Sequence, residues 1–294
     1  MMLLLTGATG LVGSTLLPRL LAEGTDVRCL VRDPRRLGAQ RVRVQIALGD
    51  LTDPPSFRNA LRGVQTVVHL AASIRDQPRG SIEELGGIAT WRMVEAAERQ
   101  GVERFVFFSA LGASTHHRTR FLRAKALAEQ AVREADVRSI VFAPSIVYAP
   151  GDPWLTLLER LALLPLMPIS GHGRAAFQPI WAEDVAACVV AALRAEQPRA
   201  HERYELAGPE TLTHSDMVRT LLRSLNRRRA LLHVPTPVVS RSLRALERVG
   251  GRGVFATWDE AELMETTMTS SRGAADAEAL GVTPQRMAAV LGSG

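Results

Sequence analysis

Short apolar runs alternate with longer amphipathic segments over the first two thirds of the chain. Between the runs lie segments with helical spacing, such as 90–101 and 121–135. Strands and helices that alternate at this pitch form a parallel sheet through right-handed crossovers, with helices on both faces. The pattern therefore predicts an α/β fold with a doubly wound parallel sheet. The runs expected to be strands are 2–6, 27–31, 42–48, 66–71, 104–109, 138–143 and 203–207.

The alternation weakens after Pro150, where turns rich in proline and glycine follow. It returns briefly over 177–193, and the remainder is mostly helical in pattern. No window reaches the ~18 apolar residues that a membrane-spanning helix needs. We expect two domains, which divide the chain as follows: a sheet domain of 1–150 and 176–200, and a small, mostly helical C-terminal domain of 151–175 and 201–294.

The first predicted strand leads directly into TGATGLVGSTLL, which contains Gly7, Gly10 and Gly13. A glycine-rich turn between a strand and a helix lets the backbone approach a pyrophosphate, whose charge then meets free N–H groups at the helix N-terminus. The strand before the motif, the helix after it and the surrounding βαβ pattern are the context that this interpretation requires. The alternative is a glycine turn in a protein that binds no nucleotide.

The end of the second strand bears on the choice between NAD and NADP. A carboxylate there would bind the ribose 2′-hydroxyl of NAD, whereas arginine accommodates the 2′-phosphate of NADP. Arg32 follows the strand, and Arg35 and Arg36 follow Asp33, so three guanidinium groups compete with one carboxylate. The sequence favours NADP(H) over NAD(H), with a solvated turn as the alternative. After the third strand, Asp50 is placed either to accept from the adenine amino group or to form a turn.

Charge and composition exclude some partners but do not identify the function. The formal net charge of +6 permits contact with phosphates, but no recognition motif accompanies it, so we expect no nucleic-acid partner. Cys29 and Cys188 lie in apolar stretches, where buried thiols are typical. His116 and His117 have no acidic residue or cysteine nearby at ligand spacing, so no metal site is predicted. The reduced cysteines and an N-terminal segment without a basic region favour a cytoplasmic location.

Several segments follow one another as they do in a known enzyme family. TGATGLVGS, LVRDP, GDLTD, VVHLAA, FVFFSALGA, AKALAEQAV, FAPSIVYAPGD and FQPIWAEDVA resemble the extended and atypical short-chain dehydrogenase/reductases, a group that includes NAD(P)-dependent epimerases and dehydratases. The likeness is greatest to the atypical branch that contains the nucleotide-binding accessory subunit of respiratory complex I and its bacterial relatives. It runs over nearly the whole chain and is strongest from 1 to 195. It implies a Rossmann-type NAD(P)(H)-binding domain with a small C-terminal substrate domain.

The resemblance also implies which residues contact the cofactor. Lys125 is the only lysine among 36 lysine and arginine residues, which argues against a chance match. Its compact ammonium reaches ribose hydroxyls where a broad guanidinium would not substitute freely. The matching positions are Gly7, Thr9, Gly10, Leu11, Val12, Gly13, Arg32, Asp50, Leu51, Ala71, Ala72, Lys125, Pro144 and Ile146.

The resemblance breaks down four residues before Lys125. Catalytic members carry a Tyr-x-x-x-Lys pair on one helical face, and the ammonium lowers the pKa of the tyrosine so that it acts near neutral pH. Phe121 stands in the tyrosine's place and has no proton to donate. We take Lys125, Ser109 and Tyr148 as candidate catalytic residues, with Ser109 near the family's serine position. Other candidate donors are Thr115, His116 and His117; for these three and for Tyr148, the favoured alternative is a loop residue without a catalytic role.

Two classes of function stay open. The first is an NADPH-dependent reductase of an apolar or quinone-like small molecule, whose proton comes from water or from a group other than tyrosine. The second is a non-catalytic nucleotide-binding module with a role at a membrane or in a redox complex. The arginine-rich segment 217–252, with an amphipathic pattern over 237–250, adds weak peripheral contact with anionic membranes as a hypothesis. The alternative is a helix that packs its leucines on the main domain.

Overall fold

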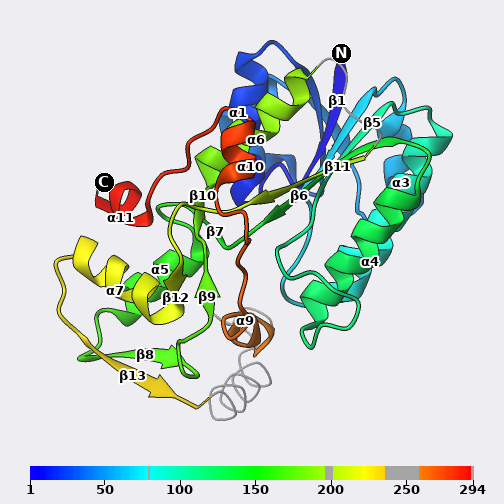
Figure 1. The fold of residues 1–294 in the computed structure, drawn as a ribbon. Coiled ribbons are helices and arrows are strands. Elements are labelled where there is room, and N and C mark those ends of the chain that lie inside the picture. The colour runs from blue at the N-terminus through cyan, green and yellow to red at the C-terminus, as the bar shows by residue number, and fades with distance from the viewer. Residues whose placement is uncertain (79, 196–200, 236–257, 293–294) are drawn as a thin grey trace.

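The computed structural model describes residues 1–78, 80–195, 201–235 and 258–292 (Figure 1). Its centre is a seven-stranded sheet with the order β11-β6-β5-β4-β1-β2-β3, in which all neighbouring strands run parallel. The predicted doubly wound sheet is therefore confirmed. Its strands are β1 (Met2–Thr6), β2 (Asp26–Val31), β3 (Gln45–Leu48), β4 (Thr66–His69), β5 (Arg104–Phe108), β6 (Arg138–Pro144) and β11 (His201–Leu206).

Helices cover both faces of the sheet, which explains why the central strands are continuous apolar runs. The core on one face contains buried side chains of α1 (Leu11–Ala22) and α6 (Ala182–Arg194). The core on the other face contains those of α3 (Ala89–Arg99) and α4 (Arg120–Glu134). Figure 1 shows these two layers on opposite sides of the strands. Shorter connecting elements are η1 (Pro34–Val42), α2 (Pro54–Arg58), η2 (Asn59–Leu61) and η3 (Glu84–Ile88).

The strand order reverses between β1 and β4. From β1 the chain adds β2 and β3 on one side, and β4, β5, β6 and β11 on the other. In open parallel sheets the loops at such a point diverge and leave a crevice at the carboxyl ends of the strands, where ligands bind. The glycine loop after β1 and the end of β4 both lie at this position, so the fold places the predicted phosphate-binding loop at this crevice.

A second cluster of buried side chains, which includes Tyr148, Leu155, Phe177 and Met217, lies outside the sheet layers. This separate core supports the proposal of a small second domain. Residues 201–206, assigned to that domain by their place after the loosened pattern, instead form β11, because they pair with β6 along its whole length. The elements around the second core are β7 (Val147–Tyr148), α5 (Pro153–Leu161), β8 (Leu166–Ser170), β9 (Ala176–Phe177), β10 (Ile180–Trp181), β12 (Leu212–Thr213), α7 (His214–Ser224), β13 (Ala230–Val234), α9 (Trp258–Leu263) and α11 (Met287–Gly292).

Residues 263–292 connect the two cores. Ala277, in α10 (Ala275–Ala279), belongs to the core of the main sheet, whereas Met287 and Val290 belong to the second cluster. Two hydrogen bonds fix this path: the Glu205 N–H donates to Asp276 at 2.6 Å, and the Gln285 N–H donates to Asp184 at 2.9 Å. The segment therefore belongs to neither core alone.

The part of the chain that the structure describes contains no helix long and apolar enough to cross a membrane. The amphipathic pattern over 237–250 lies outside the described residues. Of the arginine-rich segment 217–252, the structure describes residues 217–235.

Candidate functional site

The turn between β1 and α1 is built on glycines that have no room for a side chain. Gly7 has φ of 71°, in the left-handed region, and a Cβ there would lie 2.7 Å from the backbone nitrogen of Ala71. A Cβ on Gly13 would lie 2.1 Å from the carbonyl oxygen of Gly7. The glycines therefore let the turn fold onto the end of β4 and let the first turn of α1 rest on it.

The N-terminus of α1 suits an anion. Gly10 is the N-cap residue and supplies no side-chain hydrogen bond, and the first turn carries no acidic residue. The first N–H groups of the helix, from Leu11 to Gly13, have no acceptor within the helix itself. These groups and the helix dipole stabilise negative charge. Thr9, Leu11 and Val12, predicted as cofactor contacts, are partly buried around this point.

The loop after β2 exposes three arginines and one carboxylate, Asp33. Arg32, Arg35 and Arg36 are exposed. The Asp33 side chain accepts a hydrogen bond from the Arg35 N–H at 3.0 Å and thereby caps the 3-10 turn that follows. One Asp33 oxygen is thus engaged in its own loop, and the three guanidinium groups outnumber this carboxylate at the end of β2.

The neighbouring strand ends hold the other predicted contacts. Asp50 accepts hydrogen bonds from both the N–H and the hydroxyl of Thr52, at 3.1 and 3.0 Å, so it shapes the turn that contains the half-buried Leu51. After β4, the Ala71 N–H lies 3.4 Å from the Thr6 hydroxyl, which ties the end of β4 to the end of β1. Ala72 is exposed at the same edge.

Lys125 lies inside the molecule, 4% exposed, and its ammonium donates to the carbonyl oxygen of Phe108 at the end of β5. Its Nζ atom is 4.9 Å from the centroid of the Phe107 ring and 5.8 Å from that of Phe121. Among the described residues the ammonium has no carboxylate partner. Burial lowers its pKa from 10.5 to about 7, because the charged form loses its hydration.

A buried histidine, which sequence reasoning did not single out, lies near this lysine. His69 Nδ1 is 2.9 Å from the Thr6 hydroxyl, and its Nε2 is 3.2 Å from the Thr90 hydroxyl. Burial, and secondarily the charge of Lys125, lowers the pKa of His69 to about 3, so the ring is neutral. The signal in the sequence was a histidine inside the apolar run TVVHLA. Its role here is to join the ends of β1 and β4 to α3.

Of the two candidate catalytic hydroxyls, that of Ser109 belongs to the residue that follows Phe108, the binding partner of Lys125. Ser109 is buried directly after β5, next to the carbonyl that binds Lys125, and its hydroxyl has no hydrogen-bond partner among the described residues. Tyr148 is 0% exposed in the core of the small domain. Burial, with a smaller effect of Asp184 and Glu210, raises its pKa. Like the Ser109 hydroxyl, the Tyr148 hydroxyl is buried and has no hydrogen-bond partner among the described residues.

The remaining candidates lie in the loop before α4. Thr115 and His116 are exposed. His117 Nδ1 accepts a hydrogen bond from the Thr119 N–H at 3.0 Å, and burial lowers the pKa of its ring, so it acts as a neutral support for the start of α4. Within the described residues, no group of three or more His, Cys, Asp or Glu side chains could hold a metal ion.

The loop after β6, predicted to face the nicotinamide, is held from two sides. Pro144 ends β6 in a buried position, and Ile146 packs against the small-domain core. Between them, the Ser145 hydroxyl donates to the carbonyl of Met268 at 2.6 Å and accepts from the Gln178 N–H at 3.0 Å. The loop therefore has a fixed shape where the two cores meet.

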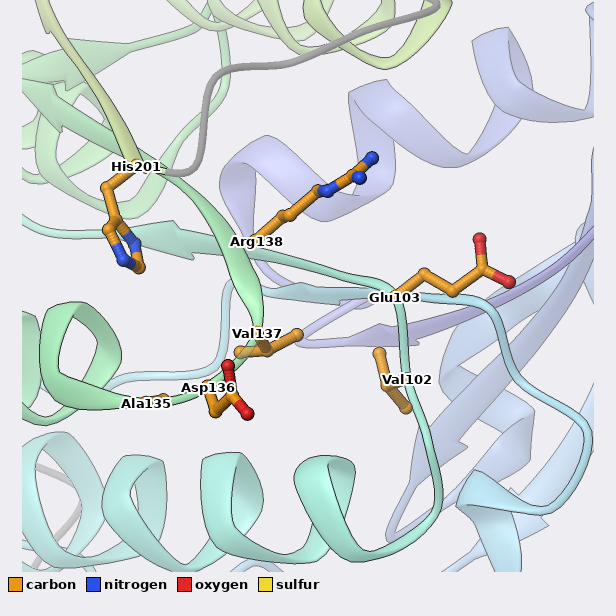
Figure 2. A pocket seen from close by; sticks show the side chains of 7 residues that line it. All are labelled: Val102, Glu103, Ala135, Asp136, Val137, Arg138 and His201. Carbon is orange, nitrogen blue, oxygen red and sulfur yellow. The ribbon is translucent and has the colours of Figure 1, made fainter.

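A cavity of about 430 Å³ lies at the opposite edge of the sheet (Figure 2). Its walls come from the residues just before or at the starts of β5, β6 and β11, whereas the predicted cofactor contacts lie at the carboxyl ends of the strands. This cavity is therefore separate from the candidate site. The side chains that line it are Val102, Glu103, Ala135, Asp136, Val137, Arg138 and His201.

Comparison with known sequences supports the interpretation of the glycine loop. The profile of a protein family described as NAD(P)H-binding matches residues 7–196. The chain is 29% identical over 243 residues to the mitochondrial NADH dehydrogenase [ubiquinone] 1 alpha subcomplex subunit 9 of Arabidopsis thaliana, covering 79% of this chain and 60% of that protein. It is 32% identical over 193 residues to a ceramide reductase of Caulobacter vibrioides, covering 65% of this chain and 60% of that protein. The chain thus spans about three fifths of the length of each relative.

Comparison with solved structures concerns the fold. The structure of a nucleoside-diphosphate-sugar epimerase from Staphylococcus aureus matches with a TM-score of 0.79 at 18% identity, covering 99% of this chain and 100% of that chain. At this identity the match establishes a shared architecture, including the small domain, and leaves the chemistry to the residues of the site.

Proposed function

Because the chain belongs to the NAD(P)H-binding family, we propose that it is an NADPH-dependent reductase of an apolar or quinone-like molecule that works without the usual tyrosine. The observation that carries this proposal is Lys125, the only lysine, buried at the carboxyl edge of the sheet without a carboxylate partner among the described residues. An unpaired buried ammonium is unfavourable for stability. Its presence is explained if the ammonium binds the nicotinamide ribose.

The proposed binding roles follow from the geometry of the site. The N–H groups at the start of α1 would bind the pyrophosphate, and the tight turn at Gly7 and Gly13 would let it approach. Lys125 would donate to the ribose hydroxyls, and the fixed loop from Pro144 to Ile146 would limit where the nicotinamide lies. When bound, NADPH supplies a hydride to an acceptor such as a carbonyl carbon.

The proton must come from a group other than residue 121, because the phenyl ring of Phe121 carries none. The Lys125 ammonium, with a pKa of about 7, is matched to proton donation near neutral pH. The Ser109 hydroxyl, which has no partner among the described residues, is proposed to hold the substrate oxygen. Tyr148 is proposed only as a packing residue, since it lies in the core of the small domain, whereas Ser109 directly follows Phe108, whose carbonyl binds Lys125.

We propose NADPH rather than NADH because Arg32, Arg35 and Arg36 are exposed beside a carboxylate that already caps its own loop. Calorimetric titration of the nucleotide-free protein with each cofactor tests this choice. NADPH should bind more tightly, and Arg32→Gln should reduce that preference while NADH affinity stays within a factor of about two. Equal affinities in the wild type, or an unchanged preference in the variant, would contradict it.

The relative named as a ceramide reductase supports an apolar substrate. Steady-state NADPH oxidation in the presence of quinones, enones and long-chain ketones tests the enzyme proposal. Turnover that disappears in Lys125→Met and persists in Arg133→Met, an exposed change on the same helix, would support it.

The second candidate is a non-catalytic nucleotide-binding module in a redox complex or at a membrane. Phe121 favours it, and so does the relative that is a subunit of NADH dehydrogenase. Tight NADPH binding with no turnover against the whole substrate panel would favour this second candidate over the reductase.

A further inference from the structure

Five arginine side chains gather around the end of α7 and the start of β13. With Leu222 and Ala230 they line a surface hollow of about 430 Å³. Of these five arginines, only Arg219 has a carboxylate partner among the described residues, with its Nη1 atom 3.0 Å from the Asp216 carboxylate. The other four guanidinium groups of the hollow therefore have no carboxylate beside them in the part of the chain that the structure describes. The five are Arg219, Arg223, Arg227, Arg228 and Arg229.

Part of this group is held in place by the end of α5. The side chains of Arg227 and Arg229 both donate to the carbonyl oxygen of Ala162, at 3.1 and 3.3 Å. Ala162 is the C-cap residue of α5, where the helix dipole favours positive charge. The arginines are thereby attached to the loop that continues from Ala162 into β8.

That loop and the two strands beside it expose leucines. Leu163 and Leu164 follow Ala162 and are 64% and 46% exposed. Leu166 on β8 and Leu232 on β13 are 45% and 47% exposed. In Figure 1 the two strands lie side by side at the lower left, away from the main sheet.

The strand register explains why these leucines face outward together. Side chains alternate between the two faces of a strand. Met167 and Ile169 of β8 point into the small-domain core, so Leu166 and Pro168 point outward. β8 and β13 are parallel, with Leu232 opposite Pro168. We call the surface formed by Leu163, Leu164, Leu166, Leu232 and the five arginines the leucine–arginine edge.

We propose that the leucine–arginine edge docks on the surface of a bilayer that contains anionic lipids. Apolar side chains that enter the boundary between headgroups and acyl chains, with basic side chains beside them, are the pattern of interfacial membrane contact. Guanidinium groups match lipid phosphates in geometry as well as in charge. A nucleic acid or an acidic protein would use the arginines but would leave four exposed leucines without a role. This inference does not depend on nucleotide binding, because the edge and the cofactor site share no residue.

Co-sedimentation of the full chain with vesicles tests the proposal. The vesicles contain either phosphatidylcholine alone or phosphatidylcholine with about one third phosphatidylserine, at low and at physiological salt. Wild-type protein should bind the anionic vesicles much more strongly, and salt should weaken the binding. Since each basic residue near such a surface contributes about a fivefold factor, Arg227→Gln, Arg228→Gln and Arg229→Gln together should reduce partitioning by about 100-fold.

The leucines have their own test, because charge alone would not need them. Leu163→Ser with Leu164→Ser should reduce partitioning by about tenfold at unchanged net charge. The controls carry matched changes at exposed positions elsewhere and should stay within about twofold of wild type. They are Arg43→Gln with Arg58→Gln and Arg133→Gln for charge, and Val42→Ser with Leu127→Ser for apolar surface.

Three results would overturn the proposal. The first is equal binding of the wild type to neutral and anionic vesicles. The second is partitioning of either edge variant at the wild-type level. For the arginine variant this would mean that the contact lies elsewhere, and for the leucine variant that it is purely electrostatic. The third is binding to duplex DNA or polyglutamate that exceeds binding to vesicles at the same salt and depends on the same arginines. Circular dichroism of each variant distinguishes a lost contact from a lost fold.

Discussion

Replacing Lys125 with methionine is expected to make the nucleotide-free protein more stable and to weaken its binding of NADPH. Methionine fills a similar volume and carries no charge. Burial lowers the pKa of Lys125 from 10.5 to about 7, and each pKa unit corresponds to ~1.4 kcal/mol. At pH 7 the buried ammonium therefore costs up to about 4 kcal/mol of folding free energy.

The net gain in folding stability of Lys125→Met is smaller than this cost. The variant leaves the Phe108 carbonyl without its lysine donor, and an unsatisfied buried acceptor costs about 1–3 kcal/mol. We expect a gain of about 1–3 kcal/mol, which in a chain of this size corresponds to a rise in Tm of roughly 2–6 °C. Because the unfolded chain binds more protons than the native state between pH 7 and 10.5, wild-type stability should gain relative to the variant as pH rises through this window.

Thermal and urea unfolding of nucleotide-free protein at pH 7 and pH 9, together with calorimetric titration with NADPH, measure both effects. Arg133→Met, an exposed change on the same helix, is the control and should alter neither quantity appreciably. A Lys125→Met variant that is no more stable than wild type, or that binds NADPH equally well, would refute the reasoning. The first result would mean that the ammonium is not penalised by burial, and the second that it does not touch the cofactor.

Three further predictions concern the same sheet edge. Gly13→Ala should weaken NADPH binding at least tenfold by calorimetry, because the new Cβ would lie 2.1 Å from the Gly7 carbonyl; Gly10→Ala, with its nearest atom at 3.3 Å, should cost less. Phe121→Tyr should raise the initial rate of NADPH-dependent reduction at least tenfold, since a positioned general acid is worth roughly 10² to 10⁴; an unchanged rate would place proton donation elsewhere. The unfolded-state pKa of His69 is near 6.5 and the native one about 3, so stability should fall by about 2–3 kcal/mol between pH 7 and pH 4.5 in wild type, and by less in His69→Gln, when measured by urea unfolding.

The main sheet could be predicted from the sequence because its central strands are buried on both faces. Such strands are continuous apolar runs, and each of the seven expected runs contains a strand of the sheet, although 42–48 is a strand only over Gln45–Leu48. The small domain was harder to predict because its strands pair with strands that are distant in the sequence. β9 and β12 are two-residue strands about 35 residues apart, and their sequences carry no alternation long enough to recognise. β11 was visible as a run, but its position beside β6 depends on contacts that no local pattern encodes.

The candidate site was predictable where spacing within one element defines it. The glycine loop and the pairing of Lys125 with Phe121 on one face of α4 follow from i, i+3 and i, i+4 relations. The burial of Tyr148 could not be predicted, since it depends on packing against residues far away in sequence. His69 was missed for the same reason: its two hydroxyl partners come from β1 and α3. The contacts of these residues with a cofactor remain predictions.

The path of residues 263–292 constrains how the chain can acquire its structure during synthesis. Ala277 completes the core of the sheet, and Met287 and Val290 complete the core of the small domain. Both cores lack these side chains while this segment is still inside the ribosome. The glycine loop and the first strands therefore leave the ribosome well before the last residues of the core that they share. We expect nascent chains that stop before residue 263 to expose apolar surface and to require chaperones, however well the first 195 residues match the pattern of a nucleotide-binding domain.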